Sequence, residues 1–516
     1  MQKKIQSIIV ILLGVSIVAA FFAVAIVYVR KADLPQDSLV RIGHENLYSD
    51  TGYIDYAQEV YFDVENYPDM AEMGLFWTEW DDDRDEMALI DADSAEGAAL
   101  VDPNKPTIIL VHGMLSDGHY SPERFYLNQL IANPAEFDLQ SEEGVPLGLI
   151  WQNMGWNVGY FHYNRFASEG ARPHYIESKI WAIDGVSGIR YRHTDGTLTE
   201  NATEYSVAEH FAAEYIRAMN CLPNAMGSQE IRVAAHSMGG ELSTAGLFLL
   251  SLLAEDGQLD NDKLPNRFAM LDPYFSTTVL DENGEIFFSL SPTDITIRWS
   301  GKPLPYDNVG YTMIDCLKKI SSMGIAIEYY TFDLSTLVIA MPYPLVTELK
   351  KLCVYVIMVP NYDQTNPEYS KLTDGHNGVR DWYLCSLYSS PVTNASVDNE
   401  IAASASTPTE TILALKGKTF YMKDGSGTIL AADDTFSQTV RVFFDSKGGN
   451  KVSSMDMEVN QNAQMPAAPT KEGVTFAGWY IENNLLQQPI DTAFNEEYFL
   501  SPSSPGVINV YAKWIE

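Results

Sequence analysis

The sequence predicts an α/β fold with a mostly parallel sheet, and two observations from the middle of the chain support it. Short apolar runs rich in β-branched residues are typical of strands buried on both faces, and they cover residues 107–111, 156–163, 231–235, 267–271, 325–332 and 352–359. Helical periodicity lies between some of these runs, over residues 206–219 and 240–254. Alternating strands and helices imply right-handed crossovers, and ligands in such sheets bind at the carboxyl ends of the strands.

The composition is that of a large, acidic, folded protein. The chain has 516 residues, of which 46% are hydrophobic, and 69 acidic residues against 33 basic ones leave a formal charge of −36. This charge argues against nucleic acid as a partner and suits a protein that stays soluble outside a cell. The four cysteines form no Cys-x-x-Cys motif, so we expect no metal site, no cofactor and no assigned disulfide, with Cys353 a small core residue.

The N-terminus contains an uncharged apolar run over residues 8–29, flanked by basic residues on both sides. At about 1.5 Å per residue such a run spans a hydrocarbon core of about 30 Å. Cleavable signals usually have a shorter apolar core of about 7–15 residues, although residues 23–25 offer a small-residue cleavage site. We therefore expect residues 1–31 to form an uncleaved signal anchor, with secretion after cleavage as the alternative, and the acidic remainder to lie outside the cytoplasm.

Composition also divides the rest of the chain. Residues 32–104 are acidic and aromatic, and we expect a few strands there that lead into a catalytic domain over residues 105–390. The charge run at residues 81–86 lacks the glycine and spacing of a calcium loop and is interpreted as a solvated turn. Residues 391–437, rich in Ser, Ala and Thr at first, are predicted to be a linker with short strands, followed by a separable β-rich unit over residues 438–516.

A candidate nucleophile, Ser237, follows the predicted strand at residues 231–235. It lies in Ala-His-Ser-Met-Gly, and a helical segment comes directly after it. A sharp turn between a strand and a helix exposes a serine hydroxyl, and it needs small residues two positions either side because the two backbones crowd there. Ala235 departs from the usual glycine, and an ordinary strand–turn–helix corner is the alternative interpretation. His236 is expected to belong to the turn and not to act as a base, because adjacent side chains diverge.

Backbone amides at two strand ends are candidates for an oxyanion hole. His112-Gly113 ends the run at residues 107–111, and a glycine there allows a tight turn that leaves the following N–H groups free. In acyl-transfer enzymes such groups act together with the N–H after the nucleophile. We predict an oxyanion hole from the N–H of Met238 and the N–H of Met114 or Leu115.

His376 is the candidate base. It follows the last predicted strand and precedes a helical stretch at residues 379–387, so we expect a loop that folds back over the sheet. An imidazole with an ordinary pKa of about 6.5 can take and return a proton at neutral pH. A histidine of a surface loop is the alternative.

Three aspartates satisfy the chain order of serine, acid and histidine, namely Asp272, Asp333 and Asp363. The acid holds the histidine in its working tautomer. We favour Asp272 because Pro273 follows it at once and stops the strand at the sheet edge. Asp333 and Asp363 stay in reserve.

With these motifs in place, residues 105–390 resemble an α/β-hydrolase of the lipase and esterase kind. Leu271-Asp272-Pro273 is similar to the pancreatic-type lipases, whose acid follows the sixth strand. In most of the superfamily the acid follows the seventh strand, which keeps Asp333 open. The resemblance implies Ser237 as nucleophile, His376 as base and acid, Asp272 as the residue that orients it, and an oxyanion hole of backbone amides.

Residues 438–516 resemble the internalin-type B repeat, also called the Listeria–Bacteroides repeat, of bacterial surface proteins. The resemblance rests on Gly448-Gly449, Gly478-Trp479-Tyr480 and Tyr511-Ala512-Lys513-Trp514. It implies a small β-rich module with an adhesive or spacing role and a possible partner at the cell surface.

The sequence thus predicts a serine hydrolase of the bacterial cell surface, an esterase or lipase that acts on a carboxylic ester or lipid through an acyl-serine intermediate. One alternative is a surface adhesion protein on an inactive hydrolase scaffold, and another is amide or thioester hydrolysis by the same residues. The insertion at residues 275–324, which contains Phe287-Phe288 and Trp299, is either a lid or pocket wall or a segment packed against the sheet. Acyl-chain length, natural substrate and oligomeric state stay open.

Overall fold

The computed structural model describes most of the predicted catalytic region and parts of the C-terminal unit. The described residues are 73–81, 86–114, 147–168, 173–185, 188–193, 197–222, 229–276, 278–280, 286–289, 296–299, 302–303, 309–332, 343–359, 371–388, 393–394, 400–423, 435–452, 455–458, 463–464, 466–481, 493–494 and 507–515. The apolar run at residues 8–29, most of the charge run, Leu115, Asp333 and Asp363 lie outside them. Within the described residues no helix has the length and apolarity needed to cross a membrane.

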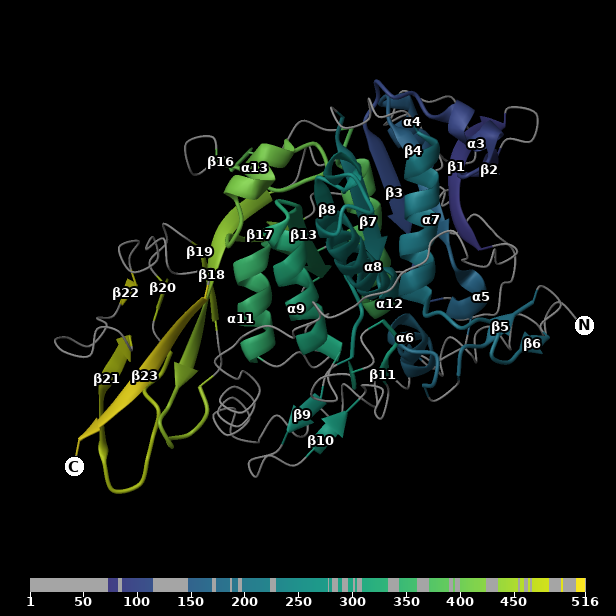
Figure 1. Ribbon diagram of the computed structural model, residues 1–516. Coiled ribbons are helices and arrows are strands. Elements are labelled where there is room, and N and C mark those ends of the chain that lie inside the picture. Colours follow the sequence, from purple (N-terminus) through teal and green to yellow (C-terminus); the bar gives the residue numbers. More distant parts are fainter. Residues whose placement is uncertain are drawn as a thin grey trace, which may run out of the picture.

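One 13-stranded sheet runs through the described residues (Figure 1), in the order β2-β1-β4-β3-β7-β8-β13-β14-β17-β18-β23-β21, with β19 on β18. The strands up to β17 are β1 (Gly74–Asp81), β2 (Glu86–Asp91), β3 (Thr107–Val111), β4 (Asn157–His162), β7 (Ile231–His236), β8 (Arg267–Leu271), β13 (Ala326–Phe332), β14 (Val354–Val359) and β17 (Thr419–Lys423). Every pairing from β4 to β17 is parallel, and β1 joins β4 antiparallel. The predicted α/β class with a mostly parallel sheet is confirmed.

Helices cover both faces of the parallel part of the sheet, which gives two hydrophobic cores. One face carries α6 (Pro173–Trp181), α7 (Val207–Cys221), α8 (Met238–Glu255), α9 (Val309–Ser322) and α11 (Tyr343–Leu352). The other carries α4 (Leu147–Asn153), α12 (Lys371–Cys385) and α13 (Thr409–Ala414). The parallel strands are buried on both faces, as their continuous apolar runs predict.

Shorter elements complete the described residues. They are the helices α3 (Ala95–Leu100), α5 (Asn164–Ala167) and η3 (Asn261–Lys263), and the strands β5 (Tyr191–Arg192), β6 (Leu198–Thr199), β9 (Thr278–Leu280), β10 (Ile286–Ser289), β11 (Thr296–Ile297), β12 (Lys302–Pro303), β15 (Thr393–Asn394), β16 (Glu400–Ile401), β20 (Ala463–Gln464) and β22 (Ala493–Phe494). The insertion expected at residues 275–324 thus contains two small hairpins, followed by α9 (Figure 1). Its Trp299 is buried against Trp181, with ring centroids 5.6 Å apart, so this part of the insertion packs on the domain.

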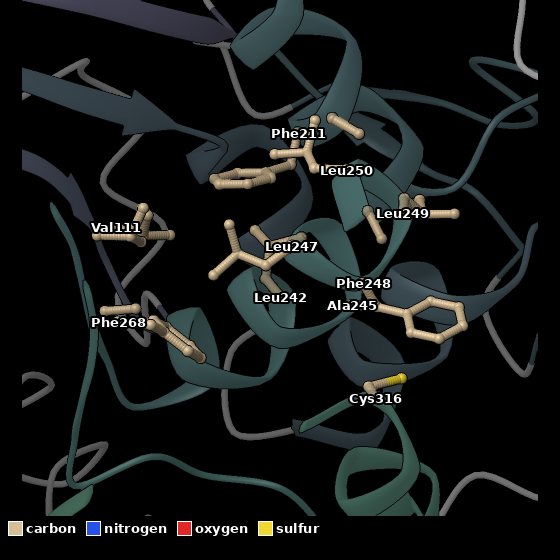
Figure 2. Packing of buried hydrophobic residues seen from close by; sticks show 14 of the residues in the cluster. Val111, Phe211, Leu242, Ala245, Leu247, Phe248, Leu249, Leu250, Phe268 and Cys316 are labelled. Carbon is tan, nitrogen blue, oxygen red and sulfur yellow. The ribbon is translucent and has the colours of Figure 1, made fainter. Parts of the chain in front are cut away.

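The helix after Ser237 is buried along almost its whole length, with 16 of its 18 residues buried. Leu242, Ala245 and Leu249 of α8 are fully buried, and Figure 2 shows them between Phe211 of α7 and Cys316 of α9. A helix that is apolar nearly all round belongs in the interior of a domain. The first turn of α8, which directly follows the candidate nucleophile, is therefore held by packing along the whole helix.

A buried ion pair joins two neighbouring strands on the face of the sheet that α4, α12 and α13 cover. Arg267 of β8 donates from Nη2 to Glu328 Oε1 of β13 at 2.6 Å and from Nε to Oε2 at 2.7 Å, and both side chains are fully buried. The same guanidinium donates to the carbonyl oxygens of Ser404 and Thr407 at 2.6 and 2.5 Å. The pair therefore connects two parallel strands to a segment about 140 residues later in the chain.

We expect Glu328→Gln to lower the free energy of unfolding by about 3–5 kcal/mol, because it leaves the buried Arg267 charge without its partner. Urea unfolding followed by circular dichroism measures the change. Glu348→Gln, which removes an ion pair with the half-exposed Lys351 on α11, is the matched control and should cost less than about 1 kcal/mol. Equal losses in the two variants would show that the buried pair has no special role.

The segment expected to be a linker differs from that expectation. Residues 402–405 are almost fully buried. Arg232 donates to the Ala405 carbonyl at 2.7 Å, and Arg267 donates to the carbonyls of Ser404 and Thr407. After α13, β17 adds a further parallel strand to β14, so β14 is not the last strand of the parallel sheet. Small Ser and Ala side chains suit this segment because its backbone carbonyls lie against the arginines. A composition typical of a linker is here a composition that permits close packing.

The C-terminal unit continues the same sheet. The 11-residue β18 (Thr435–Asp445) pairs with β17 through its first residues and with β19 (Met455–Glu458) and β23 (Val507–Ile515) through its later ones. β21 (Thr475–Ile481) pairs antiparallel with β23, which places Trp479 opposite Ala512 and Tyr480 opposite Tyr511. The two motifs of the predicted B repeat are thus cross-strand neighbours, and Phe444 packs on the buried Trp479 with ring centroids 5.0 Å apart. This unit shares a strand pairing, β17 with β18, with the parallel part of the sheet.

All four cysteines are free thiols. Cys353 is buried at the start of β14, as expected for a core residue, Cys316 and Cys385 are also buried, and Cys221 is exposed.

Candidate active site

Ser237 lies in a strained turn between the central strand β7 and α8. Its backbone has φ 55° and ψ −129°, a region that residues other than glycine rarely adopt. The turn is held because the Ser237 N–H donates to Leu271 O of β8 at 3.1 Å and the Gly240 N–H donates back to Ser237 O at 2.9 Å. Strain of this kind persists only where the surrounding structure enforces it.

Two glycines let the neighbouring backbones approach this turn. A Cβ on Gly239 would collide with the carbonyl oxygens of His112 and Val111, so the position two residues after the serine accepts only glycine without rearrangement. A Cβ on Gly113 would lie 2.6 Å from Ser237 Cβ and 3.1 Å from Ser237 Oγ. The His-Gly strand end and the serine turn, predicted from separate motifs, are therefore in direct contact.

Asp272 and His376 meet beside this turn. His376 Nδ1 donates to Asp272 Oδ2 at 2.6 Å, and the aspartate side chain is 3% exposed against 30% for the histidine. Asp272 directly follows β8, with φ 43°, and its other oxygen accepts from Thr331 Oγ1 at 2.9 Å and from the Phe332 N–H at 3.4 Å. The carboxylate is thus oriented by β13 on one side and bound to the imidazole on the other.

The setting of His376 differs from the predicted loop. The residue lies inside α12, which begins at Lys371, several residues before the predicted helical stretch. Asp-Gly-His-Asn-Gly has low intrinsic helix propensity, but helix propensity is a weak preference that packing overrides. Val379, Trp382 and Tyr383 of α12 are buried in the core on that face, and this packing carries the helix back through His376.

His236, next to the serine, contacts the candidate base. Its Nε2 donates to the His376 carbonyl oxygen at 3.1 Å, and the two ring centroids are 4.4 Å apart. Burial, followed by the influence of His376, holds the pKa of His236 well below its usual value, so the ring stays neutral. This agrees with the expectation that His236 belongs to the turn and is not the base.

Two of the residues whose backbone amides are predicted to form an oxyanion hole lie at the start of α8 and directly after Gly113. Met238 is the first residue of α8, and amides in the first turn of a helix have no acceptor one turn earlier. The positive end of the helix dipole adds to their affinity for negative charge. On the other strand, Met114 packs against the core directly after Gly113, whereas Leu115 lies outside the described residues.

His112 orders the strand end that precedes Met114. The Tyr163 N–H donates to His112 Nε2 at 3.1 Å, so the proton of the neutral ring is on Nδ1, which donates to Gly113 O at 2.7 Å. Burial lowers the pKa of His112 to about 3, so the ring stays uncharged at neutral pH, and the two hydrogen bonds fix its tautomer. Because a trans peptide directs its C=O and the next N–H to opposite sides, holding the Gly113 carbonyl also sets the direction of the Met114 N–H.

The structure therefore brings together the residues predicted at four separate places in the chain: His112-Gly113, Ser237, Asp272 and His376. Among the described residues, the Ser237 hydroxyl makes no hydrogen bond; such bonds are commonly long in unliganded sites and shorten when substrate binds. With Nδ1 bound to Asp272, the imidazole has Nε2 left to exchange a proton. Sequence reasoning missed Thr331, whose only signal was its position near the end of the run at residues 325–332.

Comparison with known proteins supports the C-terminal assignment directly. Residues 441–513 match the Listeria-Bacteroides repeat domain, which agrees with the resemblance predicted for residues 438–516. Over 73 residues the chain is 34% identical to a “Putative Gly-rich membrane protein” of Evansella cellulosilytica, a match that covers 14% of this chain and only 8% of that relative. Among solved structures, a “putative carboxylesterase” from Lactobacillus plantarum is 14% identical with a TM-score of 0.23, over 46% of this chain and 72% of the other. The similarity to that structure is too low to carry an argument about the site.

Proposed function

We propose that the chain is a serine hydrolase of the α/β-hydrolase kind that cleaves carboxylic esters through an acyl-serine intermediate. The observation that carries the proposal is the hydrogen bond of 2.6 Å between Asp272 and His376 beside a serine in a strained strand–helix turn. The chain order of Ser237, Asp272 and His376 is that of α/β-hydrolases, and the serine follows the central strand as it does there. A scaffold used only for adhesion would have no need to hold Asp272 on His376 beside a strained serine turn.

In the proposed reaction, Ser237 Oγ attacks the ester carbonyl carbon while its proton moves to His376 Nε2. Asp272 holds the imidazole in the tautomer with the proton on Nδ1 and stabilises the imidazolium that forms. The N–H groups of Met238 and of Met114 or Leu115 bind the oxyanion. His376 then protonates the leaving alcohol as the C–O bond breaks, and a water molecule activated by the same Nε2 releases the acid from Ser237.

Hydrolysis of p-nitrophenyl esters of graded acyl length tests the reaction, and labelling by a fluorophosphonate tests the nucleophile. We expect hydrolysis that rises above the blank for at least one chain length, and one equivalent of label on Ser237. Labelling without ester hydrolysis would point to an amide or thioester substrate. Neither hydrolysis nor labelling would contradict the proposed function and favour the adhesion alternative.

We further propose that the enzyme acts outside the cytoplasm, held to the cell membrane by residues 8–29. The supporting observations are the uncharged apolar run, the formal charge of −36 and the C-terminal Listeria-Bacteroides repeat. We expect protease added to intact cells to digest the chain. In untreated cells we expect to recover the chain in the membrane fraction. Recovery in the culture medium would favour the cleaved, secreted form, and recovery in the cytosol would contradict both.

A further inference from the structure

Two glutamates outside the proposed triad are completely buried beside it. Glu177 lies on α6 and Glu241 in the first turn of α8, four residues after Ser237, and neither side chain is exposed. A buried carboxylate is costly unless it is paired or hydrogen-bonded. The contacts of these two groups therefore need an explanation that the ester-hydrolysis mechanism does not supply.

Each carboxyl group accepts hydrogen bonds from a different part of the site, and the backbone and the side chain of Ser276 both bond to Glu177. The Ser276 N–H, four residues after Asp272, donates to Glu177 Oε1 at 2.5 Å, and Trp181 Nε1 of α6 donates to Glu241 Oε1 at 2.5 Å. The second oxygen, Oε2, of each group is buried and meets no donor from the described residues. The helices α6 and α8 pack against each other, and a side-chain hydrogen bond joins Glu177 to Glu241. Two ionised carboxylates are acceptors only, so the interaction becomes favourable when one of them carries a proton.

The surroundings favour a protonated carboxyl at this place. Burial raises the pKa of Glu177 to about 7, and burial together with the charge of Glu177 raises the pKa of Glu241 well above its usual value. Tyr274, from the segment after Asp272, is a further titratable group that faces them, and it stays neutral because burial raises its pKa. The nearby Lys179 donates to Phe166 O at 3.3 Å, and His210 of α7 hydrogen-bonds Thr203 at 3.2 Å.

We propose that Glu177 and Glu241 share one proton and act as positioning residues, which connect the first turn of the nucleophile helix to the segment that follows Asp272. The connection runs from Ser237 along one turn of α8 to Glu241, across to Glu177, and on to Ser276. When the shared proton is lost, two negative charges face each other in a buried site, and α6, α8 and residues 273–276 separate. The structural part of this proposal stands by itself, whereas its effect on turnover rests on the proposed function.

The direction of the pH effect follows from the two raised pKa values. A carboxyl group whose pKa is higher in the folded state than in the unfolded chain stabilises the fold below the unfolded value, 4.5, and loses that contribution as the pH rises through the folded value. For Glu177 the loss runs from about 4.5 to about 7, and for Glu241 it continues to higher pH. The pair therefore makes the fold less stable on the alkaline side.

Thermal unfolding of the full chain between pH 5 and 9.5, followed by circular dichroism, tests the shared proton in the unmodified protein and in Glu241→Gln and Glu177→Gln. An amide has the shape of a protonated carboxyl and does not titrate. We expect Tm of the unmodified protein to fall by about 3 °C more than that of either variant over this range. Glu255→Gln, at the exposed far end of the same helix, is the matched control and should follow the unmodified protein.

Infrared spectroscopy gives a direct reading that needs no variant to fold. The unmodified protein should show the band of a protonated carboxyl group at pH 7, and the band should disappear as the pH is raised to 9.5. Absence of the band at pH 7, or identical Tm profiles for Glu241→Gln and the unmodified protein, would overturn the proposal. A Tm that rises with added calcium and falls with a chelator would also overturn it, since a cation and not a proton would then join the two groups.

The effect on catalysis is measured separately from these two readings. With an ester that the protein hydrolyses, the alkaline limb of kcat should move to higher pH in Glu241→Gln, while KM at pH 6 stays within about twofold of the unmodified value. An unchanged alkaline limb would contradict the positioning role. If the protein hydrolyses no ester, the proposed function fails, but the Tm and infrared results on the shared proton are unaffected. The failure of one proposal is therefore distinguishable from the failure of the other.

Discussion

Replacing Ser237 with alanine is expected to lower kcat for ester hydrolysis by about a million-fold, the size of the loss when the nucleophile of a serine hydrolase is removed. Without Oγ no acyl-serine forms, and the remaining rate comes from the oxyanion amides and substrate binding alone. Steady-state rates on the best p-nitrophenyl ester measure the change. KM should alter little, since the hydroxyl contributes mainly to the transition state.

The control for this prediction is Ser251→Ala on the same helix. Ser251 is buried and donates to Leu247 O at 2.8 Å, far from the turn, so its loss should leave kcat within about threefold of the unmodified value. Because Ser237 has φ 55°, alanine inherits the same backbone strain, and the circular dichroism spectrum and Tm should stay close to those of the unmodified protein. If Ser237→Ala kept even a tenth of the activity, Ser237 would not be the nucleophile.

Replacing Asp272 with asparagine should lower kcat by about ten-thousand-fold with little change in the fold. An asparagine can present its NH₂ group to His376 Nδ1, which then must be the acceptor, and the proton moves to Nε2. In that tautomer the imidazole cannot take the proton of Ser237. Steady-state kinetics at pH 7–8 measures the loss, and fluorophosphonate labelling should slow in parallel.

The reserve acids supply the contrast for this substitution. Asp333→Asn and Asp363→Asn should each retain kcat within about threefold, because the described contacts of His376 lead to Asp272. Equal losses in Asp272→Asn and Asp333→Asn would contradict the assignment. A full loss in Asp333→Asn alone would transfer the role to the aspartate that follows the next strand.

The sequence predicted the strands and helices that precede and follow Ser237 closely. Apolar runs became β3, β4, β7, β8, β13 and β14 because strands buried on both faces must be apolar throughout, and this leaves a continuous signal. Ser206 and Glu209 form a capping box at the start of α7, close to where periodicity placed that helix. Local chemistry was sufficient in these elements since packing and propensity favour the same structure.

The sequence predictions that differ from the structure share a cause: packing in the folded protein overrode a local conformational preference of the chain. The Ser-, Ala- and Thr-rich stretch near residue 404 has the composition of a linker, yet its carbonyls bind two buried arginines. Two glycines around His376 disfavour a helix, yet α12 passes through them. The C-terminal repeat was recognised from its Trp and Gly motifs, but the composition near residue 437 gave no sign that its first strand pairs with β17 of the parallel sheet.

The sequence by itself determined the α/β class, the serine turn and the C-terminal repeat, because strand burial, a small-residue turn and a dense aromatic motif are each encoded within a few neighbouring residues. The sequence did not decide which of three aspartates is the acid, because each of them satisfies the chain order of serine, acid and histidine. Only the tertiary structure brought His376 to Asp272, 104 residues away, and joined Glu177 to Glu241. The physical reason is that a hydrogen bond depends on the position of its two atoms in space, and the topology of the parallel sheet sets that position for residues far apart in the chain.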